Sequence, residues 1–232
     1  MRLLVFGIHP DDIELSCGGS VALAARQGHE VILADLSTGE ASSNGTPEER
    51  AKEAMEASKI LGATQRVNLG FHDTKIQCED PQQLHAVVSC VRRFKPDFVF
   101  IPHKEDPHPD HASGGELIER SLYFAGVQGY QTGADAWAVK QGLIYIGRLE
   151  IDPDFIVDIT STFEVRVRAI KAHRTQFIGG EGRKPTPINS PEFLPFIEAR
   201  SRCYGFRIGA RYGEPFLTLK PMALSDFNLF MG

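Results

Sequence analysis

The chain has 232 residues, of which 42% are hydrophobic and 24% charged, and its formal net charge is −5 at pH 7. This length and composition suit a single globular domain with a substantial core, and they exclude intrinsic disorder. The acidic balance, without any run of Lys or Arg, argues against a nucleic-acid partner, because counterion release requires a basic face.

No segment has the pattern of a membrane or export signal. The N-terminal apolar run at 3–8 has six residues, whereas a signal peptide needs roughly 7–15 and a membrane span roughly 18. The four cysteines, Cys17, Cys78, Cys90 and Cys203, include no CxxC pair, which favours free thiols over a disulfide or metal framework. We therefore predict a cytoplasmic protein with no membrane partner.

Apolar runs and helical segments alternate along the first half of the chain. The capping-box pattern Thr46-Pro47-Glu48-Glu49 marks the start of a helix that ends near Gly62. An Ala-rich helical segment opens at Gly18-Gly19 and runs to Gln27. The predicted strands lie at 2–8, 30–36, 67–69 and 97–102, and the remaining helices at about 81–94 and 111–125.

This alternation predicts a three-layer α/β/α sandwich with a mostly parallel, Rossmann-like sheet and a ligand crevice at the carboxyl ends of its strands. We predict one domain over 1–232, with the Rossmann-like core at 1–126 and a C-terminal part at 127–232 that walls the crevice. That part contains apolar stretches at 143–146 and 155–157, a helix capped by Ser161 and a last helix opened by Ser190-Pro191.

The first strand ends in His9-Pro10-Asp11-Asp12-Ile13-Glu14, which puts an imidazole and three carboxylates within six residues. So much charge cannot be buried unpaired. A metal ion would resolve the conflict, because His9 and Asp12 could ligate one zinc while Asp11 acts as a base. The alternative is that an aspartate caps the next helix and His9 is a satisfied polar group.

A second cluster follows the fourth strand, where residues 102–111 place three histidines and three acids in a proline-rich loop. Both clusters leave buried strands and should converge in one crevice. Because a catalytic zinc takes three protein ligands and keeps one open position, His9, Asp12 and one further histidine predict one Zn²⁺ per subunit. Iron or another divalent ion is also possible, since two nitrogens and one carboxylate do not select zinc strictly.

The motifs His-Pro-Asp-Asp at 9–12 and His-Pro-Asp-His at 108–111 resemble those of the PIG-L/LmbE-like zinc-dependent N-deacetylases. Within that family the chain is most similar to the bacterial deacetylases of bacillithiol biosynthesis, through segments 35–40, 45–50 and 66–69. The resemblance implies zinc on His9, Asp12 and His111, with Asp11 as general base. It also implies that His108, as a protonated imidazole, faces the developing oxyanion.

Other polar residues are candidates for supporting roles. Asp110 could receive a ring N–H from a histidine and fix its tautomer, or be an exposed loop carboxylate; Glu14 could support the site as an acceptor, or be a first-turn Glu favoured by the helix dipole. His103 matches neither motif and is interpreted as a loop residue. Ser43, Asn44 and Arg50 follow the second strand, and their polar groups suit the hydroxyls of a sugar, although Arg50 could instead be exposed on its helix.

The predicted function is hydrolysis of the N-acetyl group of an N-acetylglucosamine conjugate, a small-molecule amino sugar. By resemblance the preferred substrate is N-acetylglucosaminyl L-malate; the alternative is a chitin-type oligosaccharide, and a homo-oligomer is expected from the family. A nucleotide-binding module is disfavoured because Gly7-Ile8-His9-Pro10 departs from GxGxxG. A phosphoesterase would often bridge two metals, and a carbohydrate-binding protein without catalysis would not need Asp11 and His108.

Overall fold

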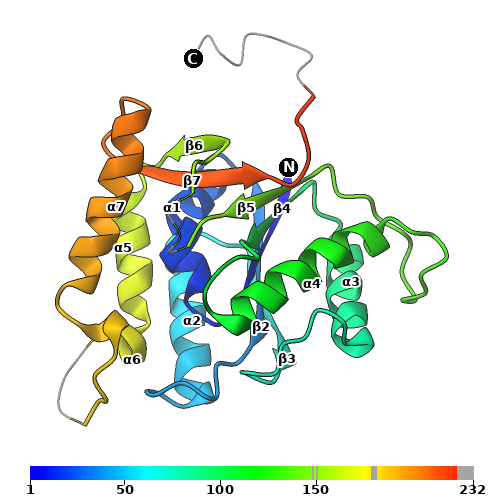
Figure 1. Cartoon of the computed structure of the whole chain (residues 1–232), viewed down its shortest axis with the longest axis horizontal. Coiled ribbons are helices and arrows are strands. Elements are labelled where there is room, and N and C mark those ends of the chain that lie inside the picture. The colour runs from blue at the N-terminus through cyan, green and yellow to red at the C-terminus, as the bar shows by residue number, and fades with distance from the viewer. Residues whose placement is uncertain (148, 150, 179–181, 224–232) are drawn as a thin grey trace.

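The computed structural model describes residues 1–147, 149, 151–178 and 182–223. Seven strands form one sheet in the order β3-β2-β1-β4-β5-β7-β6 (Figure 1). β1 to β5 pair in parallel, whereas β7 is antiparallel to both β5 and β6. The strands are β1 Arg2–Gly7, β2 Glu30–Ser37, β3 Gln65–Phe71, β4 Phe98–Pro102, β5 Gln141–Tyr145, β6 Phe155–Asp158 and β7 Gly213–Thr218. The predicted α/β fold with a mostly parallel sheet is confirmed.

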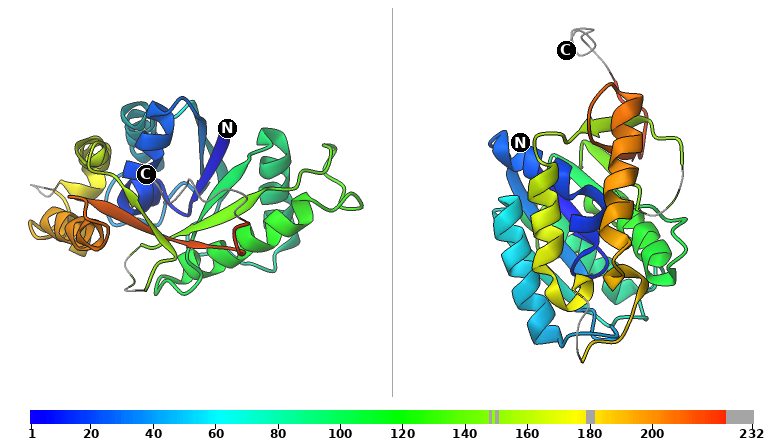
Figure 2. Two further views of the ribbon diagram at one scale, coloured as in Figure 1. Left: turned by 90° about the horizontal axis from the view of Figure 1, so that it is seen from above. Right: turned by 90° about the vertical axis from the view of Figure 1, so that its left-hand side faces the viewer.

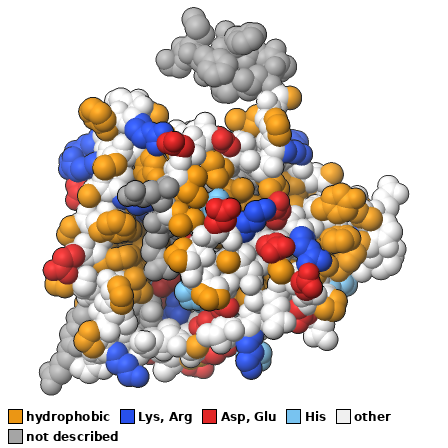
Figure 3. Space-filling model, in the orientation of Figure 1, with side chains coloured by type: hydrophobic (Ala, Val, Ile, Leu, Met, Phe, Trp, Pro, Cys, Tyr) orange, Lys and Arg blue, Asp and Glu red, His pale blue; other side chains and the backbone are white. Residues whose placement is uncertain are grey.

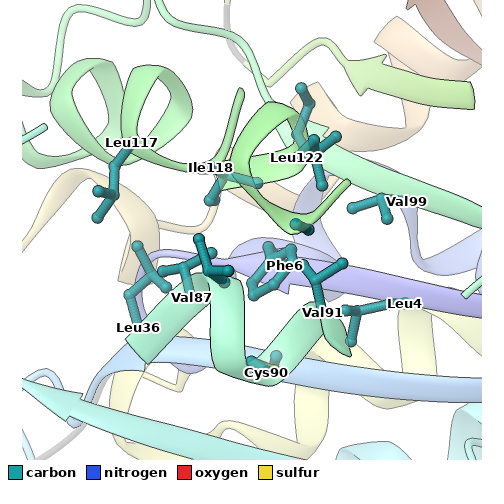
Figure 4. Packing of buried hydrophobic residues seen from close by; sticks show 14 of the residues in the cluster. Leu4, Phe6, Leu36, Val87, Cys90, Val91, Val99, Leu117, Ile118 and Leu122 are labelled. Atoms are coloured by element: carbon teal, nitrogen blue, oxygen red, sulfur yellow. The ribbon is translucent and has the colours of Figure 1, made fainter. Parts of the chain in front are cut away.

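Helices cover both faces of the sheet (Figure 2). One face carries α3 Pro81–Phe94 and α4 Pro109–Ala125; the other carries α1 Asp12–Arg26, α2 Pro47–Leu61 and α5 Phe163–Ala172. Alternate side chains of β1 point to opposite faces of the sheet. Leu4 and Phe6 pack under α3 and α4 (Figure 4), and Leu3 and Val5 pack under α1. The short α6 Arg174–Phe177, the 3₁₀ turn Pro187–Asn189 and α7 Phe193–Arg207 follow α5.

The predicted bounds of α2 and α3 are confirmed, but α1 begins earlier than predicted, at Asp12. The helix is kinked at Cys17, where φ is −140°. Glu214 of β7 accepts the backbone N–H groups of Gly19 and Ser20 at 2.8 and 2.7 Å. The Gly18-Gly19 pair therefore opens the second half of the helix, and a buried carboxylate caps that half.

Three C-terminal features differ from the sequence prediction. α5 begins at Phe163 after Thr162, so Ser161 is not its cap, and α7 begins at Phe193, after Ser190-Pro191. β7 was not predicted, because Glu214 and Pro215 are residue types that are rare in strands. Pro215 is tolerated there because β5 pairs with β7 only from Phe216 onward.

The sheet fixes the position of the site. β1 and β4 are neighbours, whereas β2 and β5 lie on their outer sides, so the chain reverses its winding between β1 and β4. At such a switch point the two connections diverge and leave a crevice at the carboxyl ends of the strands. Both acidic-histidine motifs begin at this crevice.

Surface and cysteine chemistry agree with the composition. Basic and acidic side chains are interspersed on the face in Figure 3. All four cysteines are free thiols. Within the described ranges, no helix is long and apolar enough to cross a membrane.

Candidate metal centre and active site

The turn after β1 is held in an unusual backbone conformation. Asp11 has φ of 150°, a region that residues with a side chain rarely adopt. Arg50 stabilises this turn: its Nη2 donates to the Pro10 carbonyl at 3.0 Å and lies 3.2 Å from Asp11 Oδ2, and its Nη1 donates to the Gly39 carbonyl at 3.0 Å. Arg50 is buried rather than exposed on its helix.

Backbone contacts orient the two ends of the motifs toward each other. Asp12 Oδ2 accepts the N–H groups of Ile8 and His9 at 3.1 and 2.7 Å, which fixes its carboxylate at the end of β1. In the second motif His108 is the N-cap of α4, and its Nδ1 accepts the N–H of Asp110 at 3.2 Å. This cap places His111 in the first turn of α4, facing Asp12.

Three donor atoms from the two motifs form a nearly regular triangle. His9 Nδ1 lies 3.3 Å from His111 Nε2 and 3.5 Å from Asp12 Oδ2, and the latter two atoms are 3.3 Å apart. Tetrahedral zinc with bonds of about 2.0–2.1 Å holds its ligand atoms about 3.3–3.4 Å apart. His9, Asp12 and His111 are therefore a candidate metal site whose dimensions suit zinc.

The electrostatics of the triangle require positive charge. Burial opposes charging of His9, but Asp12 and Asp73 outweigh it and raise its pKa to about 10. Burial likewise opposes charging of His111, whose pKa Asp12 and Asp106 raise to about 9. Burial would raise the pKa of Asp12, yet the two imidazoles hold it well below its usual range. Because the pKa values of both imidazoles are raised, protons compete with a cation for this site.

Asp73 supports the site and was missed by the sequence analysis. Its Oδ1 lies 3.0 Å from His9 Nε2, and its Oδ2 accepts the N–H of Ala41 at 3.2 Å. Asp110 Oδ2 lies 3.7 Å from the same imidazole nitrogen and accepts the N–H of Thr74 at 2.6 Å. Asp73, rather than Asp110, is therefore the carboxylate close enough to accept the ring N–H of a histidine, the role that the sequence predicted for Asp110. The available signal was its place in the loop just after β3.

His9, Asp73 and Asp110 also form a second group of possible donors. The two groups share one imidazole, and a neutral imidazole carries a single N–H. When Nδ1 of His9 faces a cation, Nε2 bears the proton and donates it to Asp73. The short contact to Asp73 thus favours a supporting role for this carboxylate over a second cation.

The two predicted catalytic groups, Asp11 and His108, line the same cavity, and their pKa values shift in opposite directions. Burial raises the pKa of Asp11 against the opposing charge of Arg50, which makes this carboxylate a better proton acceptor. Burial and the charges of His111 and His9 lower the pKa of His108. Since its Nδ1 accepts a hydrogen bond, His108 is favoured as a neutral ring with its proton on Nε2, not as the protonated imidazole expected from sequence.

The motifs open into a cavity of about 350 Å³. Ser43, Arg50 and His103 line it. The Asn44 amide instead bridges to the Lys184 backbone, with bonds of 2.9 and 2.8 Å, and Asn44 is not among the lining residues. His103 is in the loop after β4 and outside the donor triangle, as predicted.

Glu14 does not contact the metal-site residues as an acceptor. It is fully buried, and its Oε1 lies 2.6 Å from Arg66 Nη1 and 3.5 Å from His173 Nε2. Arg66 also binds Asp35 with bonds of 2.6 and 2.7 Å. This buried ion cluster ties α1 to β2 and β3 beneath the site.

Comparison with known proteins identifies the family. The model of the PIG-L family, described as GlcNAc-PI de-N-acetylase, matches residues 4–122, more than half of the chain. The chain belongs to the PIG-L family. The resemblance based on the motifs at 9–12 and 108–111 is confirmed, and the protein is an enzyme of this deacetylase family.

Individual relatives differ in the reaction that their names state. The diacetylchitobiose deacetylase of Thermococcus kodakarensis is 27% identical over 92% of this chain and 81% of its own. The probable N-acetyl-alpha-D-glucosaminyl L-malate deacetylase 2 of Bacillus subtilis is 27% identical over 77% and 84%. The 4-oxalmesaconate hydratase of Pseudomonas putida is 27% identical over 72% and 71%. A conserved protein of Thermus thermophilus superposes with a TM-score of 0.88 at 35% identity over 97% of both chains.

Proposed function

We propose that this PIG-L enzyme hydrolyses the N-acetyl amide of an N-acetylglucosamine conjugate to a free amine and acetate. The proposal includes one divalent cation per chain, zinc, held by His9, Asp12 and His111. The observation that carries it is the donor triangle, with edges of 3.3, 3.3 and 3.5 Å, in a cavity that also contains Asp11 and His108.

A bound cation would act as a Lewis acid toward the amide carbonyl and make water more acidic. In this proposal Asp11 takes a proton from the attacking water, and Arg50 keeps its carboxylate in place. His108 donates its Nε2–H to the oxygen on which negative charge develops. Asp11 then delivers its proton to the leaving amine, so the water proton ends on the product nitrogen.

Similarity supports two substrates. The malate deacetylase of B. subtilis supports N-acetylglucosaminyl L-malate as the preferred substrate and a role in bacillithiol biosynthesis. The chitobiose deacetylase of T. kodakarensis, which matches more of this chain, supports the chitin-type alternative. Ser43 and Arg50, which line the cavity, are proposed contacts for sugar hydroxyls. A homo-oligomer in the cytoplasm stays a prediction.

The test is amine release from N-acetylglucosaminyl L-malate and from N,N′-diacetylchitobiose, with zinc present and after chelation. The proposal predicts amine release from at least one substrate, and chelation should abolish it. Amine release that survives complete removal of the metal would refute the metal-dependent mechanism, and no release from either compound would refute both as substrates.

A further inference from the structure

One wall of the active-site cavity is apolar. Polar residues reach the cavity from the loops after β2 and β3, such as Ser42, Ser43 and Thr74. The apolar side chains on one side of the cavity come from α1, the 3₁₀ turn and α7. They are Leu15, Ile188, Phe193, Phe196 and Ile197, hereafter the apolar wall.

The apolar wall begins next to the proposed general base. Leu15 follows Asp11 by one helical turn, and its N–H donates to the Asp11 carbonyl at 3.0 Å. The N-terminal part of α7 continues the wall and lies beside α6 in Figure 1. An apolar group attached near the scissile amide could therefore reach this surface without leaving the cavity.

The core fixes the inner part of the apolar wall, while its rim is open. Phe193 stacks on the buried Phe177 with ring centroids 5.7 Å apart and an interplanar angle of 13°, and Ile197 is 7% exposed. Phe196, at the rim, is 47% exposed. A preformed apolar surface of this kind binds apolar ligands without ordering the protein first.

The cavity offers little to a charged group on this side. Among the described residues that line it, Arg50 is the one Lys or Arg. Its guanidinium already contacts Asp11 and the carbonyls of Pro10 and Gly39. Apolar contact with the wall is the interaction that remains for a substituent there.

We propose that the apolar wall is a subsite for an apolar part of the substrate, joined to the amino sugar. This inference rests on the proposed function and extends its substrate class to amino sugars with an apolar substituent, which neither of the two substrates named above carries. The apolar part has two possible sources with the same chemistry: an aglycone on the anomeric carbon, or an N-acyl chain longer than acetyl.

Two substrate series distinguish the sources. The first series keeps the N-acetyl group and lengthens the alkyl glycoside from methyl to butyl and hexyl. The second series keeps the methyl glycoside and lengthens the N-acyl chain by the same number of methylene groups. In one series kcat/KM should rise by about twofold to fourfold per methylene, as expected for burial of about 0.8 kcal/mol or less per methylene. Phe196→Ala should flatten this rise. Phe206→Ala is the matched control, since Phe206 is 86% exposed on the same helix and outside the cavity.

A binding measurement separates this inference from the proposed function. Titration calorimetry with the de-acetylated alkyl glucosaminides and with N-alkyl glucosamines reports affinity without turnover, and the same dependence on chain length is expected. If no substrate releases amine but binding still strengthens with chain length, the reaction is wrong and the subsite stands. If neither kcat/KM nor affinity depends on chain length in the wild-type protein, the proposed subsite is wrong. An unchanged dependence on chain length in Phe196→Ala would also overturn it.

Discussion

Replacement of Asp73 tests how the site holds its cation. Asp73 Oδ1 lies 3.0 Å from His9 Nε2, so the carboxylate can fix the ring with Nδ1 toward Asp12 and His111. Asp73→Asn keeps the size of the side chain and an acceptor oxygen but removes the negative charge. The imidazole then loses a charge-assisted hydrogen bond, which is roughly twice as strong as a neutral one.

The expected loss follows from this single contact. Removal of a carboxylate partner from a metal-binding histidine typically costs about 10–100-fold in metal affinity, or about 1.4–2.7 kcal/mol. Because Asn retains an acceptor, Asp73→Asn should weaken zinc binding by about tenfold. Asp73→Ala, which also loses the acceptor and the bond to the Ala41 N–H, should approach about a hundredfold.

The measurement is the zinc dissociation constant, obtained by competition with a chelator of known affinity. Asp110→Asn is the matched control, because its Oδ2 lies 3.7 Å from His9 Nε2, beyond hydrogen-bonding distance. This control should change the constant by less than about threefold. Wild-type affinity in Asp73→Asn, or an equal loss in Asp110→Asn, would refute the assignment of Asp73 as the partner of His9.

Three further predictions concern the base, the ligands and the core. Asp11→Ala should keep its zinc and lower turnover by about 10²–10⁴-fold; full activity would exclude Asp11 as the base. The pKa values of His9 and His111 are raised to about 10 and about 9, so protons should compete with zinc for the two imidazoles. Zinc affinity should therefore keep rising with pH up to about pH 9. A chelator titration that levels off near pH 7 would indicate ordinary imidazoles. Arg66→Ala leaves Glu14 buried without its cation and should lower the free energy of unfolding by about 3–5 kcal/mol; a loss below about 1 kcal/mol in urea unfolding would contradict this.

Much of the fold could be predicted because its first half follows local rules. Buried parallel strands give continuous apolar runs, and a capping box with a proline marks the start of α2. The C-terminal part obeys tertiary demands instead. The carboxylate of Glu214, in β7, caps the second half of α1. The two hydrogen bonds join residues that are 195 and 194 positions apart in the sequence. No local pattern reveals such a partner.

The candidate site shows the same division. Two short motifs at strand ends predicted that His9, Asp12 and one further histidine would converge, and the family resemblance implied that this histidine is His111. The donor triangle brings these three residues together. Asp73 belongs to no motif, since its role depends on where the end of β3 lies relative to β1. Arg50 lines the cavity, as expected for a polar residue near the crevice, but no sequence pattern indicates that its observed bonds also hold the strained turn at Asp11.

The most direct test of the central claim is a titration of metal-free protein with zinc, in which amine release from the two N-acetylglucosamine substrates is followed at each ratio of zinc to chain. The proposal predicts no activity without zinc and a linear rise that ends at one zinc per chain, the capacity of one donor triangle. A rise that continues to two zinc ions per chain would contradict the single-cation site. Amine release that is independent of zinc would contradict the proposed mechanism itself.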